Sequence, residues 1–504
     1  MRILIVNEAS FLDTGYARIG KELLSRFHRD GYEVAELAIF AGDLDNRAQN
    51  VPWRFYSNNP NESEQAVFSQ DGSNGYGKFR FESVICDFKP HIVIDVRDPF
   101  MYDFEYYSPL RDKYHWMIMA PVDGVPQQSQ WLDIFRNADT LITYTNWGKQ
   151  HLEEYGLNVA NTASPAASKE YFPVDQTNIN TLKNMLQING SIIGTIMRNQ
   201  PRKLFEILIA AFSKYVHMYD KNVNLYLHTS YPDVGFDLVK LLFQYRVLSR
   251  TFFTYICRNC QETLPMRFSE IATYCPKCRQ KSLKIADVYS SVPEETMNKI
   301  INMFDVYVQC ASREGFGMPQ AEAAACGIPI ITVPYAGMND ILENIPSSAM
   351  DIDGFKLNCG MHMYEACPNI DSLTNLINKS LQSNEKEVKR NLIRQSFENR
   401  YSSWEAVYNI WKQEIDKVNI EEIENRQHIP YHITQNYNIN TNLDTVDFAE
   451  SLIRNFLDDS FIGSYLNVRL IKDLHNGMTL DGLHNYLVSH FESNQIAVFN
   501  KEVA

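Results

Sequence analysis

Residues 312–330 read Ser-Arg-Glu-Gly-Phe-Gly-Met-Pro-Gln-Ala-Glu-Ala-Ala-Ala-Cys-Gly-Ile-Pro-Ile, and this stretch decides the fold. Two carboxylates, Glu314 and Glu322, stand eight positions apart, with a glycine-rich turn and the start of a helix between them. Pro319 suits the first helical position because its missing N–H is not needed there. Gly327, with a proline two residues later, is a helix stop.

The flanking segments complete a strand–loop–helix–strand unit. Residues 303–310 are a short apolar run that predicts a buried strand, and residues 328–333 predict the next strand. The free N–H groups at the start of the helix between them would point to where an anion could bind. Glu314 enters from the loop and Glu322 from the first turn of the helix, so both can reach a polyhydroxylated ligand held there.

Length and composition indicate a multidomain globular protein. With 504 residues the chain is too long for one ordinary core, and it is 45% hydrophobic and 21% charged. The apolar run at residues 1–7 is too short for a signal peptide, and no stretch approaches the roughly 18–20 apolar residues of a membrane span. We therefore expect a cytoplasmic protein. The net charge of −14 disfavours a nucleic-acid coat but leaves room for a local basic face.

Strand-like and helix-like segments alternate along the chain, which predicts an α/β fold with two parallel, Rossmann-like sheets. The predicted strands are residues 2–6, 91–96, 116–120, 140–144, 192–197, 224–228, 251–256, 303–310 and 328–333. The predicted helices are residues 16–30, 147–155, 204–219, 236–246, 294–303, 373–381, 385–400 and 403–418. The predicted domains are an N-terminal domain (1–175, with a linker at 158–176), a C-terminal domain (176–400), an insertion (255–283), a helix (401–420) and an α-rich appendage (421–504).

A basic cluster lies at residues 197–203, Met-Arg-Asn-Gln-Pro-Arg-Lys. It follows a predicted strand and opens a helix, a position that is a ligand-binding edge in α/β sheets. Arg198, Arg202 and Lys203 bring three cations to one turn, and a guanidinium fork together with a point charge suits a diphosphate. A solvated basic turn is the alternative for this cluster alone.

Four of the nine cysteines form two Cys-x-x-Cys pairs separated by fourteen residues: Cys257, Cys260, Cys275 and Cys278. Two such knuckles at ribbon spacing predict a tetrahedral zinc site, and four thiolates would close the shell, so the zinc would be structural. Residues 251–285 carry six Lys or Arg and two Glu, a side-chain charge of +4. The ribbon could fasten a long loop, or it could bind an acidic or large ligand beside the predicted ligand-binding edge.

Taken together, these motifs resemble the family-4 retaining glycosyltransferases of GT-B fold. The resemblance rests on strand–Arg-x-x-x-x-Lys–helix, on the Glu-x7-Glu stretch, and on Tyr-Ser-Ser-Trp at residues 401–404. It covers roughly residues 1–418 and implies two Rossmann-like domains facing a cleft. Residues 1–175 would form the acceptor domain and residues 176–400 the nucleotide-sugar donor domain, with residues 401–420 as a cross-over helix. It also implies a hexosyl- or pentosyltransferase that uses a nucleoside diphosphate sugar, UDP- or GDP-linked, and needs no catalytic metal.

The resemblance also assigns roles to residues. Arg198 and Lys203 would bind the donor diphosphate, with the backbone amides of Phe316, Gly317 and Met318. Glu314 would contact the transferred sugar, and Glu322 the ribose of the nucleotide.

Two residues of the N-terminal half are further candidates. Gly15 lies in the turn after the first strand, where a glycine lets the backbone approach a ligand; the resemblance places this turn at the cleft, although a plain turn explains it equally well. Asp123 stands where the family has a polar residue, often His, that orients the acceptor or the reacting sugar. An aspartate opening a turn before a glycine is the alternative reading.

The acceptor is the open question. A hydroxymethylated base in phage DNA, which would place the protein in the host cytoplasm, and a glycan are the two acceptors we consider. One competing hypothesis is a non-catalytic nucleic-acid or protein-binding module, with the zinc ribbon as its working part on a GT-B scaffold. Another is a phosphorolytic enzyme of the same fold, which would need pyridoxal phosphate.

Overall fold

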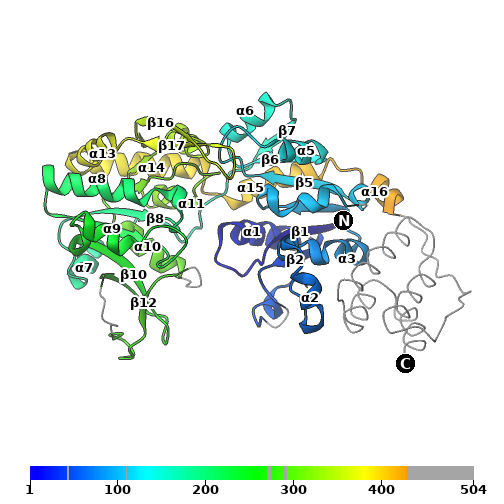
Figure 1. Ribbon diagram of the computed structural model, residues 1–504, viewed down its shortest axis with the longest axis horizontal. Coiled ribbons are helices and arrows are strands. Elements are labelled where there is room, and N and C mark those ends of the chain that lie inside the picture. The colour runs from blue at the N-terminus through cyan, green and yellow to red at the C-terminus, as the bar shows by residue number, and fades with distance from the viewer. Residues whose placement is uncertain (43–44, 109, 269–273, 288–291, 428–504) are drawn as a thin grey trace, which may run out of the picture. The chain divides into compact units, whose positions relative to one another are not determined.

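The computed structural model describes residues 1–42, 45–108, 110–268, 274–287 and 292–427 (Figure 1). They form two compact units. Unit 1 comprises Met1–Ala120, Ser129–Ile142 and the chain from Trp411, and unit 2 comprises Pro121–Gln128 and Thr143–Ile410. The domain limits expected at 175, 400 and 420 stay predictions, and residues 428–504 of the expected appendage lie outside the described residues.

The first sheet has seven strands in the order β3-β2-β1-β4-β5-β6-β7. Pairing is parallel between β1 and β2, β1 and β4, β2 and β3, and β4 and β5. The strands are β1 (Arg2–Glu8), β2 (Glu33–Ile39), β3 (Arg54–Ser57), β4 (Ile92–Asp95), β5 (His115–Ala120), β6 (Thr140–Thr143) and β7 (Val159–Thr162). The helices in this part of the chain are α1 (Gly15–Arg29), α2 (Gln65–Phe68), α3 (Lys78–Phe88), α4 (Asp103–Tyr106), α5 (Ser129–Asn137) and α6 (Asn146–Glu154).

The second sheet follows the order β11-β10-β9-β8-β13-β14-β15, with β12 paired to β10. Its strands are β8 (Ser191–Ile196), β9 (Val223–His228), β10 (Thr251–Cys257), β11 (Thr263–Arg267), β12 (Leu283–Ile285), β13 (Val306–Gln309), β14 (Ile330–Thr332) and β15 (Ser348–Ala349). The central pairs are parallel, whereas β11 and β12 run antiparallel to β10. A separate antiparallel hairpin consists of β16 (Ile352–Leu357) and β17 (Tyr364–Pro368).

The remaining helices are α7 (Gln176–Met185), α8 (Phe205–Met218), α9 (Leu238–Gln244), α10 (Glu294–Asn302), α11 (Met318–Ala325), α12 (Met338–Asn344), α13 (Ile370–Gln382), α14 (Lys386–Arg400), α15 (Trp404–Ile415) and α16 (Ile420–Gln427). In α15 the apolar stripe of Trp404, Val407, Trp411 and Ile415 is buried, as its helical spacing indicates.

The α/β class with two parallel sheets is confirmed, and each predicted strand and helix within the described residues has a counterpart. Some elements escaped the sequence-based reading. The segment expected as a linker, residues 158–176, begins with β7, the edge strand of the first sheet. The β16–β17 hairpin was also missed, because β16 is largely exposed and lacks a buried apolar run.

Strand order locates the ligand-binding edges. In the second sheet β8 leads to β9 on one side while β13 lies on the other, so the direction of winding reverses between β8 and β13. In the first sheet it reverses between β1 and β4. In open α/β sheets, ligands bind outside the carboxyl ends of the strands at such switch points.

Candidate functional site

The two motifs found in the sequence meet at the β8/β13 switch point of unit 2. Arg198 and Lys203 follow the carboxyl end of β8, and Lys203 closes the short 3-10 turn Pro201–Lys203. Glu314 lies in the loop between β13 and α11. Backbone bonds join the two segments: the amide of Ser312 donates to the carbonyl of Arg202 at 2.7 Å.

Glu314 is the centre of a buried ion-pair network. Its Oε1 contacts Nζ of Lys203, and its Oε2 accepts a hydrogen bond from Nη1 of Arg202 at 3.0 Å. Gln309 donates to Oε1 from the end of β13 at 2.8 Å. The Glu314 side chain is only 8% exposed and the Lys203 side chain 10%. This carboxylate is therefore fixed in place by three donors from two strand ends.

Electrostatics keep this network charged at neutral pH. Burial alone would raise the pKa of Glu314, but the adjacent charges of Lys203 and Arg202 lower it to about 2. Burial lowers the pKa of Lys203 to about 8, against the opposing effect of Glu314. Lys203 is thus predominantly protonated at pH 7 and loses its charge in the mildly alkaline range.

Glycines make the close packing of the Glu314 loop feasible. The amide of Gly337 donates to the carbonyl of Glu314 at 2.8 Å. A Cβ at Gly337 would lie 2.1 Å from the carbonyl oxygen of Gly315, so no larger residue fits there without a backbone shift. The loop is fixed by main-chain contacts as well as by its ion pairs.

The turn before α11 is followed by a helix that starts one residue earlier than predicted, because Met318 and not Pro319 is its first residue. Gly317 is the residue before the helix, with φ of 84°, a left-handed conformation that glycine adopts without strain. Phe316 packs inward against Tyr401, with ring centroids 5.4 Å apart. The helix begins at Met318, so its first amides are available to an anion; the roles of Phe316, Gly317 and Met318 toward a phosphate stay predictions.

Glu322 lies just beyond the first turn of α11. We predicted it in the first helical turn, but the helix starts at Met318 and Glu322 is its fifth residue. Its side chain is buried, at 5% residue exposure. The carboxylate is therefore on the inner side of the helix; the role of Glu322 toward a ribose stays a prediction.

Arg198 is oriented by a partner that the sequence did not reveal. Its Nε and Nη2 donate to the two oxygens of Asp233 at 2.9 and 3.0 Å, a bidentate fork. Asp233 lies in the loop after β9, the strand adjacent to β8. The Arg198 side chain is 49% exposed, so it is oriented yet accessible.

Asp123 belongs to the same unit and is held by Arg313. Nη1 of Arg313 contacts Oδ2 of Asp123, and its Nε lies 3.3 Å from Oε1 of Glu365 on β17. Asn358 also donates to that Glu365 oxygen, at 2.9 Å. Arg313 is 9% exposed, so it is a buried cation shared by two carboxylates.

Sequence reasoning missed Arg313 although it stands next to Glu314. Its partners are 190 and 52 residues away along the chain, so no local pattern signals the cluster. The loop that carries Asp123 is fixed by the hairpin as well: the amide of Tyr364 donates to the carbonyl of Val125 at 2.8 Å.

Gly15 belongs to unit 1, whereas Arg198, Lys203 and Glu314 belong to unit 2. It is the first residue of α1, whose preceding residue Thr14 accepts a hydrogen bond from the amide of Ala17. Its φ is not in the left-handed region, so the backbone itself does not require glycine here. A role of Gly15 toward the donor stays a prediction.

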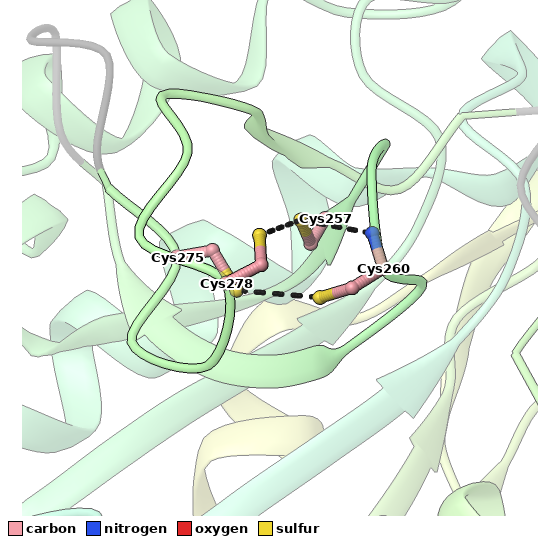
Figure 2. A group of neighbouring side chains, drawn as sticks. All are labelled: Cys257, Cys260, Cys275 and Cys278. Carbon is pink, nitrogen blue, oxygen red and sulfur yellow. Dashed lines mark hydrogen bonds between the residues drawn. The ribbon is translucent and has the colours of Figure 1, made fainter.

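The four cysteines of the expected ribbon converge (Figure 2). Their sulfur atoms all lie within 4.8 Å of one another. The Sγ atoms of Cys257 and Cys278 are 3.5 Å apart, and those of Cys260 and Cys275 are 3.6 Å apart. A tetrahedral site with Zn–S bonds of about 2.3 Å places its sulfurs about 3.8 Å apart, so the cluster fits a zinc ion.

The two knuckles are built alike. The amide of Cys257 donates to the carbonyl of Glu262, and that of Cys275 donates to Gln280, each five residues later at 2.9 Å. The residues four positions after these cysteines, Gln261 and Arg279, have φ of 59° and 58°. This repeated geometry, with two unrelated intervening sequences, indicates that a common constraint on the sulfur positions shapes both turns.

The family that matches this chain covers part of unit 2. Residues 275–396 match the family described as "Glycosyl transferases group 1". This segment is similar to glycosyl transferases. It contains Glu314 and Glu322 and begins within the second cysteine knuckle. No curated protein matches the chain at a significant level.

Solved structures match the fold over most of the chain. Sucrose-phosphate synthase from Thermosynechococcus elongatus has a TM-score of 0.58 at 15% identity, covering 83% of this chain and 98% of its own. HepE of Anabaena in complex with UDP-glucose has 0.57 at 13%, covering 82% and 100%. An E. coli trehalose-6-phosphate protein bound with UDP-2-fluoro glucose has 0.55 at 11%, covering 83% and 100%. These likenesses establish the two-sheet GT-B fold.

Among the described residues, no helix has the length and apolar character needed to cross a membrane.

Proposed function

We propose that this protein is a retaining glycosyltransferase that moves a sugar from a nucleoside diphosphate sugar to a hydroxyl acceptor. The observation that carries the proposal is the buried network of Glu314, Lys203 and Arg202 at the β8/β13 switch point, beside the start of α11. The match of residues 275–396 to group 1 glycosyl transferases supports the same reaction class. The neighbours solved with UDP-glucose and UDP-2-fluoro glucose support a nucleotide-sugar donor.

In this proposal the donor diphosphate binds to Arg198, Lys203 and the amides of Phe316, Gly317 and Met318. Negative charge builds on the diphosphate as its bond to the anomeric carbon breaks, and cations already in position stabilise that charge without reorganisation. Removing one such contact typically costs about 3 kcal/mol, or about 100-fold in rate. The cations supply this stabilisation themselves, so we propose chemistry that does not depend on a catalytic metal.

The carboxylates would orient the two sugars of the donor. Glu314 is ionised and held by three donors, so its oxygens can accept hydrogen bonds from hydroxyls of the transferred sugar without moving. Glu322 would accept from the ribose. Asp123 would orient the acceptor or the reacting sugar, with Arg313 fixing its position.

The cysteine cluster would hold a structural zinc ion. Cys257, Cys260, Cys275 and Cys278 are the four ligands, and their thiolates leave no open coordination position. Bound zinc would supply a cross-link between the two knuckles and no chemistry to sugar transfer. The family match begins at Cys275, so half of this cluster is contiguous with the donor-binding segment.

One experiment tests the class and the stereochemistry together. The purified protein is incubated with a panel of UDP-, GDP-, ADP- and dTDP-linked sugars, with neutral glycans or with hydroxymethylated DNA as acceptor. Release of the diphosphate is measured, and the product anomer is identified by NMR. Turnover of one α-linked donor to an α-linked product supports the proposal. An inverted product, or no turnover of any donor with any acceptor, contradicts it.

A second candidate is a binding module in which the ribbon is the working part, favoured by its exposed cations Arg258, Arg267, Lys277, Arg279, Lys281 and Lys284. The charges of two of these cations are balanced by carboxylates, since Arg258 pairs with Asp287 and Lys277 pairs with Glu262. This alternative predicts that Glu314→Gln leaves partner binding unchanged and that no donor is consumed.

A further inference from the structure

Three aromatic side chains of unit 1 pack together at the surface: the exposed Phe40 and Phe100, and the half-buried Tyr76 between them. The ring of Tyr76 meets Phe40 edge-to-face at 6.3 Å and Phe100 at 5.7 Å between centroids. Phe40 is 53% exposed and Phe100 43%. Rings of this size gain most when they are buried, so a mutually packed but exposed set calls for an explanation.

The cluster stands at the switch point of the first sheet. Phe40 directly follows β2, and Phe100 lies in the short 3-10 turn Pro99–Met101 that follows β4. β1 is the strand between β2 and β4, and Tyr76 touches both rings, so the cluster spans the carboxyl end of β1. This is the edge where open α/β sheets bind ligands. The donor candidates of unit 2 do not lie on it, and Gly15, whose role stays a prediction, follows the same strand β1.

Phe40 has a strained backbone, and its exposed side chain gains too little packing energy to offset that strain. Its φ is 64°, in the left-handed region, where a bulky residue costs on the order of 1 kcal/mol or more. Phe40 is nevertheless 53% exposed. A strained residue that presents an aromatic ring instead of burying it is a candidate for ligand contact.

The main chain of Tyr76 is held by a buried cation, Arg97. Arg97 is fully buried; it contacts the carbonyl oxygen of Tyr76 and donates to that of Met101 at 3.2 Å. Asp95 and Glu105, both fully buried, form ion pairs with this guanidinium. The main chain at Tyr76 and at Met101, next to Phe100, is therefore held by one buried cation, which favours a preorganised binding surface.

The charges beside the cluster favour one class of ligand. Glu8 ends β1, and Asp98 precedes the turn that carries Phe100. Asp98 accepts a hydrogen bond from the hydroxyl of Tyr16 at 2.7 Å, and Glu8 accepts one from Thr14. Carboxylates accept hydrogen bonds from hydroxyl groups and repel phosphates. Aromatic rings offer an apolar face to the C–H side of a sugar ring.

We propose that Phe40, Tyr76 and Phe100 form a platform that binds a neutral carbohydrate, with Glu8 and Asp98 accepting from its hydroxyls. The inference rests on the proposed function only in making this carbohydrate the acceptor; binding itself does not depend on turnover. A nucleic acid is disfavoured here, because its phosphates would meet the carboxylates.

The test is ligand-observed saturation-transfer NMR on the full chain, without donor, using neutral oligosaccharides of two to six hexoses. The variants are Phe40→Ala and Phe100→Ala, and the control is Phe243→Ala, an equally large exposed ring on α9 that is 73% exposed. We expect a saccharide signal for the wild type and the control, and at least a tenfold weaker signal for both platform variants. No saccharide binding, equal binding by all variants, or binding only of a single-stranded oligonucleotide overturns the proposal.

A second variant separates ligand binding from folding. Phe40→Gly removes the strain because glycine adopts a φ of 64° freely, so we expect a melting temperature at or above that of the wild type together with loss of the saccharide signal. A clearly lower melting temperature would show that the ring serves packing, and would overturn the proposal. Donor hydrolysis by the wild type, measured separately without saccharide, reports on the proposed function alone.

Discussion

The guanidinium of Arg313 contacts the carboxylate of Asp123 and reaches Glu365 on the hairpin at 3.3 Å. One buried cation thus joins the loop after β5, the loop before α11 and the β16–β17 hairpin. Nη1 of Arg202 also donates to the carbonyl of Arg313 at 2.9 Å. The position of Asp123 is therefore linked, through one residue, to the ion pairs around Glu314.

Replacing Arg313 should impair catalysis more than donor binding. Arg313→Gln leaves Asp123 and Glu365 without their shared cation, and removing one partner of a buried charge pair is strongly destabilising. We expect kcat to fall by about 10–100-fold, in line with the loss of about 1–3 kcal/mol, with a smaller change in the Kd of the nucleoside diphosphate. Arg313→Lys should recover part of kcat. The control is Arg136→Gln, an exposed pair with Asp133, which should behave as the wild type. Equal weakening of kcat and diphosphate affinity would contradict a role through Asp123.

Activity should decline in mildly alkaline solution because of Lys203. Its pKa of about 8 is lowered by burial, so the free enzyme loses this cation above pH 8, and kcat/KM for the donor should fall there. Bound diphosphate favours the charged form, so kcat should hold to higher pH. The pH profile of Lys203→Arg, whose charge persists, should lack the alkaline limb. If kcat/KM of Lys203→Arg still falls above pH 8, the fall is caused by a group other than Lys203.

Stability in acid should depend on Glu314. Its folded pKa of about 2 lies below its ordinary value of 4.5, so its contribution is fully present above pH 4.5 and is lost as the pH falls toward 2. The shift corresponds to about 3 kcal/mol. The difference in urea midpoint between the wild type and Glu314→Gln should be largest near pH 6 and shrink by pH 3. A difference independent of pH would indicate that the carboxylate is not the stabilised species.

The cysteine cluster should bind one zinc ion per chain, measured by elemental analysis of the purified protein. Cys260→Ser should reduce the zinc content and lower the melting temperature, since metal binding by a preformed site stabilises the folded state. Cys359→Ser is the matched control, because Cys359 is exposed and outside the cluster. Full zinc retention in Cys260→Ser would show that the metal lies elsewhere.

The sequence was most informative where local patterns coincide with chemistry. Apolar runs revealed the central strands, and the spacing of Glu314, Arg198 and Lys203 placed all three at strand ends, because parallel strands bring distant loops to one edge. Partners far apart along the chain left no local signal. The bidentate pairing of Arg198 with Asp233 and the position of Arg313 between two carboxylates arise only from tertiary packing. The left-handed conformation of Phe40 was invisible for the same reason.

The most direct test of the central claim, a diphosphate held by the basic turn after β8, is calorimetric titration of the full chain with UDP, GDP, ADP and dTDP. Arg198→Gln is the informative variant because the Arg198 side chain is 49% exposed. Its melting temperature is measured beside that of the wild type, since Asp233 loses a partner, and Arg136→Gln is the control. We predict that one diphosphate binds and that Arg198→Gln weakens its Kd by about 30–100-fold, the loss of a charge-assisted contact of about 2–3 kcal/mol. Equal affinity of Arg198→Gln and the wild type, or no binding of any diphosphate, would contradict the account.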